Sequence, residues 1–315
     1  MVGIFVALAT TVCWSFSIFA FTEGSRRIGA NAVNHFRLVV ATLLLTVFGV
    51  LLIDGPPSTL FTSPTSSHYF WLGCSGIIGL ALGDHFNFSG FAILGARLSS
   101  ALTTFAPIAA LVGGYLLLGE TLNLPGMLGI LITIAGILVL ILTRPGTNEG
   151  YSEHHGSFAK GILNALAGAT CQGIGLVLAK KGLNTPGPKL HFVQAAWIRM
   201  LIGTVAIYTL TILTRRFWTV TRPILSGNKA AVGFTLFGAV MGPVIGVSLS
   251  MLAITYLKVS VAQTIFSLLP VTVMPIAVFY YKERVTFRSL LGALMAILGV
   301  VILVWRENLA DVAGF

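Results

Sequence analysis

Long apolar segments alternate with short polar breaks along the whole chain. A helix that crosses the hydrocarbon core of a bilayer, about 30 Å thick, needs about 20 mostly apolar residues. The breaks are rich in Gly, Pro, Ser and charged residues, which is typical of loops between helices. This pattern predicts ten membrane-spanning helices, at residues 2–22, 31–53, 69–93, 98–118, 124–143, 158–179, 190–213, 230–257, 261–281 and 287–305.

Composition agrees with a membrane protein. Of the 315 residues, 56% are hydrophobic and 9% are charged, whereas soluble domains carry about 25% charged residues. The 19 Lys and Arg outnumber the 9 Asp and Glu, but they fall between apolar runs, where they meet headgroups or water. No basic patch with interleaved aromatic residues is present. We therefore expect a multi-pass integral protein of the plasma (inner) membrane that contacts the lipid bilayer and binds no nucleic acid.

The sequence offers no pattern for a cofactor. The three cysteines, Cys13, Cys74 and Cys171, lie inside apolar runs without metal-ligand spacing, and we expect neither a disulfide nor a metal site. No nucleotide-binding or catalytic motif is found. The first apolar segment lacks the basic region that opens a signal peptide, so we interpret it as a retained span.

The two halves of the chain repeat one another. Gly79 and Gly83 match Gly242 and Gly246 at an offset of 163 residues. A unit of five spans is odd, so its second copy must enter the membrane from the opposite side. We predict an all-α membrane protein with ten transmembrane helices as two inverted five-helix repeats. The expected parts are a first repeat at 1–143, an inter-repeat loop at 144–157, a second repeat at 158–306 and a tail at 307–315.

Further residues follow the same repeat. The offset of 163 residues relates Pro107 to Pro270, Glu120 to Glu283, Gly129 to Gly292, and Gly136 to Gly299. Seven residues apart, the last two glycines of each copy share one helix face, where small residues let helices approach closely. We interpret the two glutamates, which lie at span ends, as boundary residues.

Several motifs resemble a known family. They are VCWSFSIFAF in the first span, HFRL in the second, GDHFNFSGFAILGA in the third, and LTTFAPIAALVGGYLLLGETLNLPGMLGILITIAGILVL with its counterpart SLLPVTVMPIAVFYYKERVTFRSLLGALMAILGVVILV. Together they resemble the EamA-type branch of the drug/metabolite transporter superfamily. The resemblance implies transport, often export, of small organic molecules such as amino acids, other metabolites or drugs.

The resemblance also has limits. It does not fix the substrate, and it identifies Trp14 and its partner position Gln172 as cavity-lining candidates, with simple packing as the alternative for the tryptophan. Small multidrug members of the superfamily use an acidic residue inside the first span, whereas this span has none before Glu23. Their proton/drug mechanism is therefore not transferred to this chain.

Polar residues interrupt the third span. Asp84, His85 and Asn87 lie inside it, although a charge at the centre of a spanning helix costs at least about 2.5–3.5 kcal/mol. Asp84 and Asn87 share a face, and His85 is rotated by about 100° from Asp84. Asp84 either locks the bundle through hydrogen bonds or, as we favour, faces a cavity and binds a proton or a substrate amine. The matching positions of the second copy carry no acid; they are Val247, Ser248 and Ser250.

Two arginines also lie inside spans. Arg37 matches Arg199 at an offset of 162 residues. Each is expected either to extend toward the headgroups or to bind a carboxylate or phosphate. Because the repeats are inverted, the pair should lie near opposite membrane faces, so one substrate should not contact both. Gln263 is a further candidate for hydrogen bonding across helices.

Orientation is open at this point. With a cytosolic first residue, the cytosolic segments hold five Lys and Arg and the opposite segments twelve. Cytoplasmic loops usually carry the excess of basic residues, so the count favours both termini outside the cytosol. The family resemblance implies cytosolic termini instead.

The leading functional hypothesis is a secondary transporter. A small organic solute, amino-acid-like or drug-like, would bind between the repeats and cross by alternating access. Proton-coupled export is one form of this hypothesis, with protons as a partner and Asp84, then His85, as coupling candidates. The alternatives are a membrane-embedded lipid-modifying enzyme and a non-transporting assembly partner; we expect no enzyme. Import versus export, and monomer versus homodimer, stay open.

Overall fold

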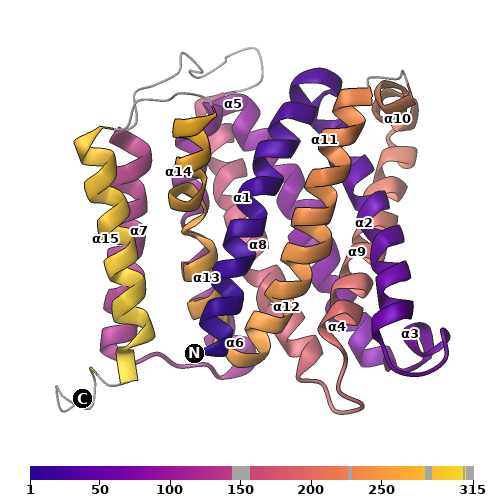
Figure 1. The fold of residues 1–315 in the computed structure, drawn as a ribbon, viewed down its shortest axis with the longest axis horizontal. Helices are drawn as coiled ribbons and strands as arrows, with labels where there is room; N and C mark the ends of the chain where they lie inside the picture. Colours follow the sequence, from indigo (N-terminus) through magenta and orange to yellow (C-terminus); the bar gives the residue numbers. More distant parts are fainter. Residues whose placement is uncertain (144–156, 226–228, 281–285, 308, 310–315) are drawn as a thin grey trace.

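The computed structural model describes residues 1–143, 157–225, 229–280, 286–307 and 309, without the side chains of residues 30, 88, 91, 92, 95–101 and 277. Every regular element in this described part is helical (Figure 1). The elements of the first half are α1 (Val2–Ile28), α2 (Ala30–Leu52), α3 (Thr59–Thr62), α4 (Ser66–Gly76), the π-helix η1 (Ile77–Leu82), α5 (Gly83–Thr103), α6 (Ala106–Leu118) and α7 (Leu124–Thr143).

The second half repeats this order. Its elements are α8 (Phe158–Leu183), α9 (Phe192–Leu213), α10 (Phe217–Leu225), α11 (Lys229–Ala239), the π-helix η3 (Val240–Gly246), α12 (Val247–Tyr256), α13 (Val259–Phe266), α14 (Leu269–Phe279) and α15 (Phe287–Val304). In the described residues, eight helices are long and apolar enough to span a membrane, and α6 is a shorter apolar helix. With the segment formed by α4, η1 and α5, they make the ten spans of a multi-pass membrane protein.

The third and fourth spans differ from their expected boundaries. The loop expected near residues 94–97 is helical, because α5 continues through it. Leu94 nevertheless lies against Gly161 near the start of α8, whereas Ala106 lies against Gly173, further along α8. The chain has therefore turned back between these positions, and α5 contains the end of one span and the start of the next.

The two halves are inverted relative to each other. Helices α1 and α8, which begin the two halves, run in opposite directions (Figure 1). The short helices α3 and α10, which follow the second span of each half, lie at opposite ends of the bundle. The prediction of two inverted five-helix repeats is therefore confirmed.

Each half inserts its first helix into the other half. The indole of Trp14 on α1 lies against Gly246, where a Cβ would come within 2.5 Å of the ring. The repeat-related Gln172 on α8 lies against Gly83. Two further contacts match in the same way: Ser15 with Thr272 corresponds to Gly173 with Ala109, and Ser17 with Gly242 corresponds to Gly175 with Gly79.

Helix irregularities recur at matching positions of the halves. The third and eighth spans each contain a π-helical segment, η1 and η3. The fourth and ninth spans are interrupted before Pro107 and Pro270, which lie in the first turn of α6 and α14. Pro243 lies within η3, and Pro275 lies within α14. All four irregular spans contact α1 or α8, so the irregular backbone gathers where the halves meet.

Glycines explain the close packing of α7 on α15, seen at the left of Figure 1. A Cβ on Gly136 would lie 2.3 Å from the backbone nitrogen of Ala296, and one on Gly292 would lie 2.4 Å from that of Leu140. Gly129 and Gly299 approach the partner helix as closely. The predicted glycine face is therefore the contact surface of this helix pair.

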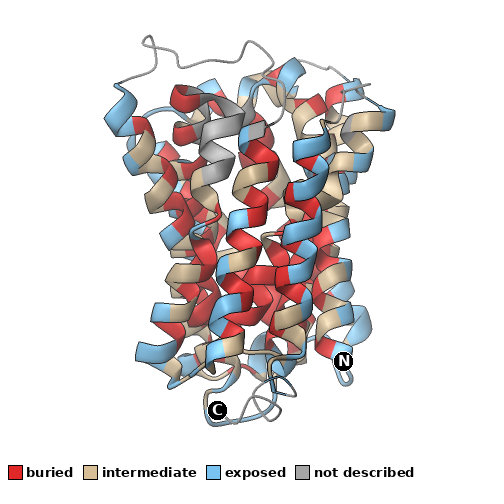
Figure 2. Ribbon diagram, turned by 90° about the vertical axis from the view of Figure 1, so that its left-hand side faces the viewer, coloured by how far each residue is buried: buried red, intermediate tan, exposed pale blue. Residues whose placement is uncertain are grey.

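Burial follows the bundle. Buried residues face the interior, and exposed residues cover the outer helix faces (Figure 2). Large apolar side chains such as Leu131, Leu294 and Leu298 are exposed on α7 and α15. An exposed apolar belt of this kind is what contact with lipid requires.

Candidate functional site

An ion pair joins the second and third spans. The Arg37 guanidinium on α2 donates through Nη2 to Oδ2 of Asp84, which follows η1 at the start of α5. Arg37 Nε also donates to Asn34 Oδ1 at 2.8 Å, and its guanidinium carbon lies 5.2 Å from the centroid of the Phe21 ring. The two charged side chains are only 16% and 14% exposed. Asp84 is therefore already engaged by a cation.

The neighbours of Asp84 divide between interior and surface. Asn87 is buried against Gly168 of α8, and its Oδ1 has no hydrogen-bond partner among the described residues. His85 is exposed, and its ring lies edge-on to Phe86 at 5.8 Å. The structure thus brings Asp84 together with Arg37, places Asn87 at the interface with the other half, and separates His85 from both.

Arg199 has a different environment from its counterpart. Its residue is 5% exposed, and Nη1 contacts the Met251 sulfur at 3.3 Å. Across the part of the chain that the structure describes, Nε has no acceptor and no carboxylate lies within ion-pair distance. The interpretation that the two arginines extend toward the headgroups is wrong, because both are drawn into the bundle by interior contacts.

The two arginines lie at equivalent depths in opposite halves. Each is seven residues after the first residue of its helix, α2 or α9. At 1.5 Å per residue, that is about 10 Å along the helix. Because α2 and α9 begin at opposite ends of the bundle, the arginines lie toward opposite faces (Figure 1).

The three remaining candidates lie on helices at the seam between the halves. Half-buried Trp14 packs edge-on against Phe266 at 5.0 Å, and Gln172 takes the equivalent place beside η1. Gln263 is buried on α13. Within the described residues, no hydrogen bond or ion pair connects Trp14, Gln172 or Gln263 to the arginines or to Asp84.

A second buried ion pair fixes one end of the bundle. Glu120 Oε1, just after α6, lies 2.7 Å from Lys180 Nζ on α8. Its Oε2 accepts the backbone N–H of Val259 at 2.7 Å, at the start of α13. Glu120 therefore joins three helices at a span end, which agrees with a structural role. Its repeat partner Glu283 lies outside the described residues.

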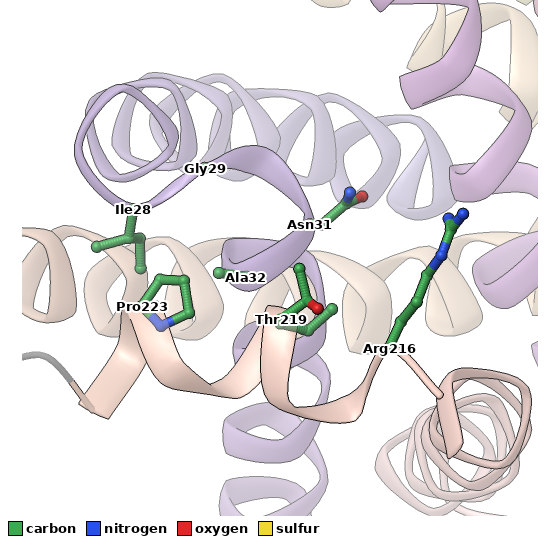
Figure 3. Close-up of a pocket in the computed structure, with 8 residues that line it drawn as sticks. Ile28, Gly29, Asn31, Ala32, Arg216, Thr219 and Pro223 are labelled. Atoms are coloured by element: carbon green, nitrogen blue, oxygen red, sulfur yellow. The ribbon is translucent and has the colours of Figure 1, made fainter. Parts of the chain in front are cut away.

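One cavity of about 380 Å³ lies at the opposite end of the bundle (Figure 3). It is lined by Ile28 and Asn31 at the turn from α1 to α2 and by Arg216, Thr219 and Pro223 in and before α10. None of the predicted site residues lines it. The cavity is thus a feature of the membrane boundary rather than of the seam.

Sequence reasoning missed the partners of the charged residues. It singled out Arg37 and Asp84 separately, although both lie near the same end of adjacent antiparallel helices. Depth matching of the two charges could have found this pair. The contact of Arg199 with Met251 had no comparable signal, because it depends on the register between α9 and α12.

Comparisons with known proteins give one family and one fold. A model of the EamA-like transporter family matches residues 1–142 and 159–305. An uncharacterized transporter of Clostridium kluyveri is 27% identical over 142 residues, which are 45% of this chain and 42% of that relative. The match thus spans less than half of the relative's length. A protein of known crystal structure has a TM-score of 0.71 at 18% identity, over 97% of this chain and 98% of its own, which shows a shared fold.

Proposed function

Because the chain belongs to the EamA-like transporter family, we propose that it is a secondary transporter of a small organic solute. The solute is amino-acid-like, binds at the seam between the inverted halves, and crosses the plasma membrane by alternating access. A membrane transporter of this family contacts lipid and a small-molecule substrate; the choice of an amino acid is the finer part of the proposal.

The matched irregular segments carry this proposal. In secondary transporters with inverted repeats, interrupted helices form the substrate site near the membrane midplane. Here η1 and η3 lie at equivalent places, and each packs against the first helix of the other half. Backbone groups released by such segments can bind solute, because non-helical backbone at membrane depth is stable where it lines a cavity or is buried in protein.

The Arg37–Asp84 pair is the proposed coupling element. A proton on Asp84, or a substrate amine that replaces the guanidinium, would break the link between α2 and α5. Either event changes the relative free energies of the two access states, which is the requirement for a ligand to shift a conformational equilibrium. A proton that crosses 100 mV gains about 2.3 kcal/mol, enough to drive such a shift.

Flux into proteoliposomes tests the proposal. Purified protein is reconstituted, and uptake of labelled amino acids, amines and neutral metabolites is compared with that of empty vesicles, with and without an imposed pH gradient. We expect uptake by the wild-type protein and a loss of its pH dependence in Asp84→Asn. Gly233→Ala serves as the control, because a Cβ there meets no atom within 4 Å.

Two results would contradict parts of this proposal. Absence of flux for every solute class would reject transport of small organic solutes. Unchanged flux and pH dependence in Asp84→Asn would leave the Arg37–Asp84 pair with a structural role only.

A further inference from the structure

The repeats place equivalent arginines in unequal electrostatic surroundings. Arg37 is neutralised by Asp84, whereas the position equivalent to Asp84 in the second half is Val247. Arg199 is as deep as Arg37 and more buried, yet it has no carboxylate within ion-pair distance in the described residues. The second half therefore holds an uncompensated cation inside the bundle.

Such a cation needs a ligand. A guanidinium has five N–H donors and stays protonated in proteins. Here the Met251 thioether, a weak acceptor, contacts Nη1, and Nε has no acceptor among the described residues. Leaving a buried charge unpaired is strongly destabilising. An anion that binds the guanidinium would supply the missing acceptors.

The surroundings of Arg199 lie on both sides of the seam. A Cβ on Gly79 in η1 of the first half would lie 3.5 Å from Arg199 Nη2, at ordinary contact distance. Ser248 precedes Met251 by three residues and so shares its face of α12. The Ser248 hydroxyl is also buried without a hydrogen-bond partner in the described part of the chain. Two polar side chains without partners are thus held by neighbouring helices α9 and α12, beside η1.

We infer that Arg199 binds the carboxylate of the transported solute, with the Ser248 hydroxyl as a second donor. This inference rests on the proposed function and names its substrate class: solutes with a free carboxylate. A guanidinium binds a carboxylate in a bidentate, charge-assisted geometry that an ammonium cannot reproduce. Because Arg37 lies toward the opposite face and is already paired, the solute carboxylate engages Arg199 alone.

Chemically matched solutes test the inference on the wild-type protein. Leucine, leucinamide and isoamylamine share a side chain but differ at the carboxylate, and the same series is made for phenylalanine and threonine. Thermal unfolding of the purified protein and flux into proteoliposomes are measured for each, since a ligand that binds the folded state raises its apparent stability. We expect stabilisation and flux from at least one amino acid and neither from its amide or amine.

Variants then locate the effect. Arg199→Gln should weaken carboxylate binding roughly tenfold or more, the range expected for a charged hydrogen bond. Arg199→Lys should recover only part of it, and Ser248→Ala should weaken binding less than Arg199→Gln. Arg222→Gln removes an equal charge from an exposed site on α10 and should bind like the wild type.

The outcomes separate the inference from the proposed function. Flux of amides and amines equal to that of the amino acids would overturn the inference and leave transport intact. Absence of flux for all solutes would reject the proposed function itself. Stabilisation by chloride and by no organic carboxylate would also overturn the inference, because Arg199 would then hold a structural halide. The solute series on the wild-type protein keeps the test decisive even if a variant fails to fold.

Discussion

At the scale of single residues, the Arg37–Asp84 pair stabilises the fold only as a pair. Both side chains are mostly buried. Removing one partner of such a pair leaves an unpaired charge and costs about 3–5 kcal/mol, whereas removing both charges costs much less. We therefore expect Arg37→Gln to destabilise the protein more than the double variant Arg37→Gln/Asp84→Asn. Chemical or thermal unfolding in detergent measures this difference.

An exposed ion pair provides the matched control. Arg306 and Glu307 lie 3.0 Å apart, and the glutamate side chain is 76% exposed. Exposed pairs contribute about 0–1 kcal/mol, so Glu307→Gln should change the free energy of unfolding little. Additive effects of Arg37→Gln and Asp84→Asn would show that the two residues do not stabilise each other.

Residue identity and depth could be predicted from the sequence, but partners could not all be predicted. Helix geometry placed Asp84 and Asn87 on one face, and both are turned into the bundle while His85 is exposed. The expected position of the two arginines near opposite faces also agrees with the structure. The sequence gave no indication that one arginine is paired and the other is not, because that depends on which helices become neighbours.

At the scale of helices, the α7–α15 contact depends on the absence of side-chain atoms. Ala at position 136 would bring its Cβ within 2.3 Å of the Ala296 backbone nitrogen, so the helices must move apart. Overpacking of this kind typically costs about 1–3 kcal/mol. We expect Gly136→Ala to lower the free energy of unfolding by that amount, measured by thermal or denaturant unfolding in detergent.

Gly233→Ala is the control for this helix-packing effect. Gly233 lies inside α11, and an added Cβ meets nothing within 4 Å. Ala is favoured over Gly in a helix by roughly 0.5–1 kcal/mol, so this variant should be neutral or more stable. Equal stability of Gly136→Ala and the wild type would mean that α7 and α15 do not pack as closely as the structure shows.

Helix existence could be read from the sequence more reliably than helix shape. Apolar run length predicted where the chain crosses the membrane, and repeated glycines marked the α7–α15 face. The π-helical segments were not predicted, because glycines at residues 79, 83, 242 and 246 are compatible with straight helices as well. The turn between the third and fourth spans was placed in a loop, but the chain keeps helical geometry there.

At the scale of the whole molecule, inversion of the halves follows from counting. Five spans per repeat reverse the direction of the second copy, and the structure shows this reversal between α1 and α8. The insertion of each first helix into the other half could not be counted from the sequence, because its residues follow a different offset from the rest of the repeat. This exchange makes the seam a surface shared by both halves and positions the irregular segments there.

The arrangement of ends also yields a prediction about orientation. Gly3 lies beside Tyr256, and Asn123 donates to the backbone of Arg306, so α1 begins and α15 ends at the same end of the bundle. The opposite end carries many basic residues, which include Arg26, Arg27, Lys160, Arg215, Arg216, Arg222, Lys229 and Arg288.

Basic loops are retained in the cytosol, so this opposite end should face it and both termini should lie outside. Alkaline phosphatase fused after Phe315 is then expected to be active, and a green fluorescent protein fused at the same position should not fluoresce. Fusions after Ser157, at the basic end, serve as the control and should give the reverse pattern. Fluorescence at Phe315 with inactive phosphatase would place the termini in the cytosol and show that the basic end is translocated despite its charge, as the family resemblance implies. The same experiment fixes which side Arg199 faces, because Arg199 lies about 10 Å from the start of α9, at the end of the bundle that holds the termini.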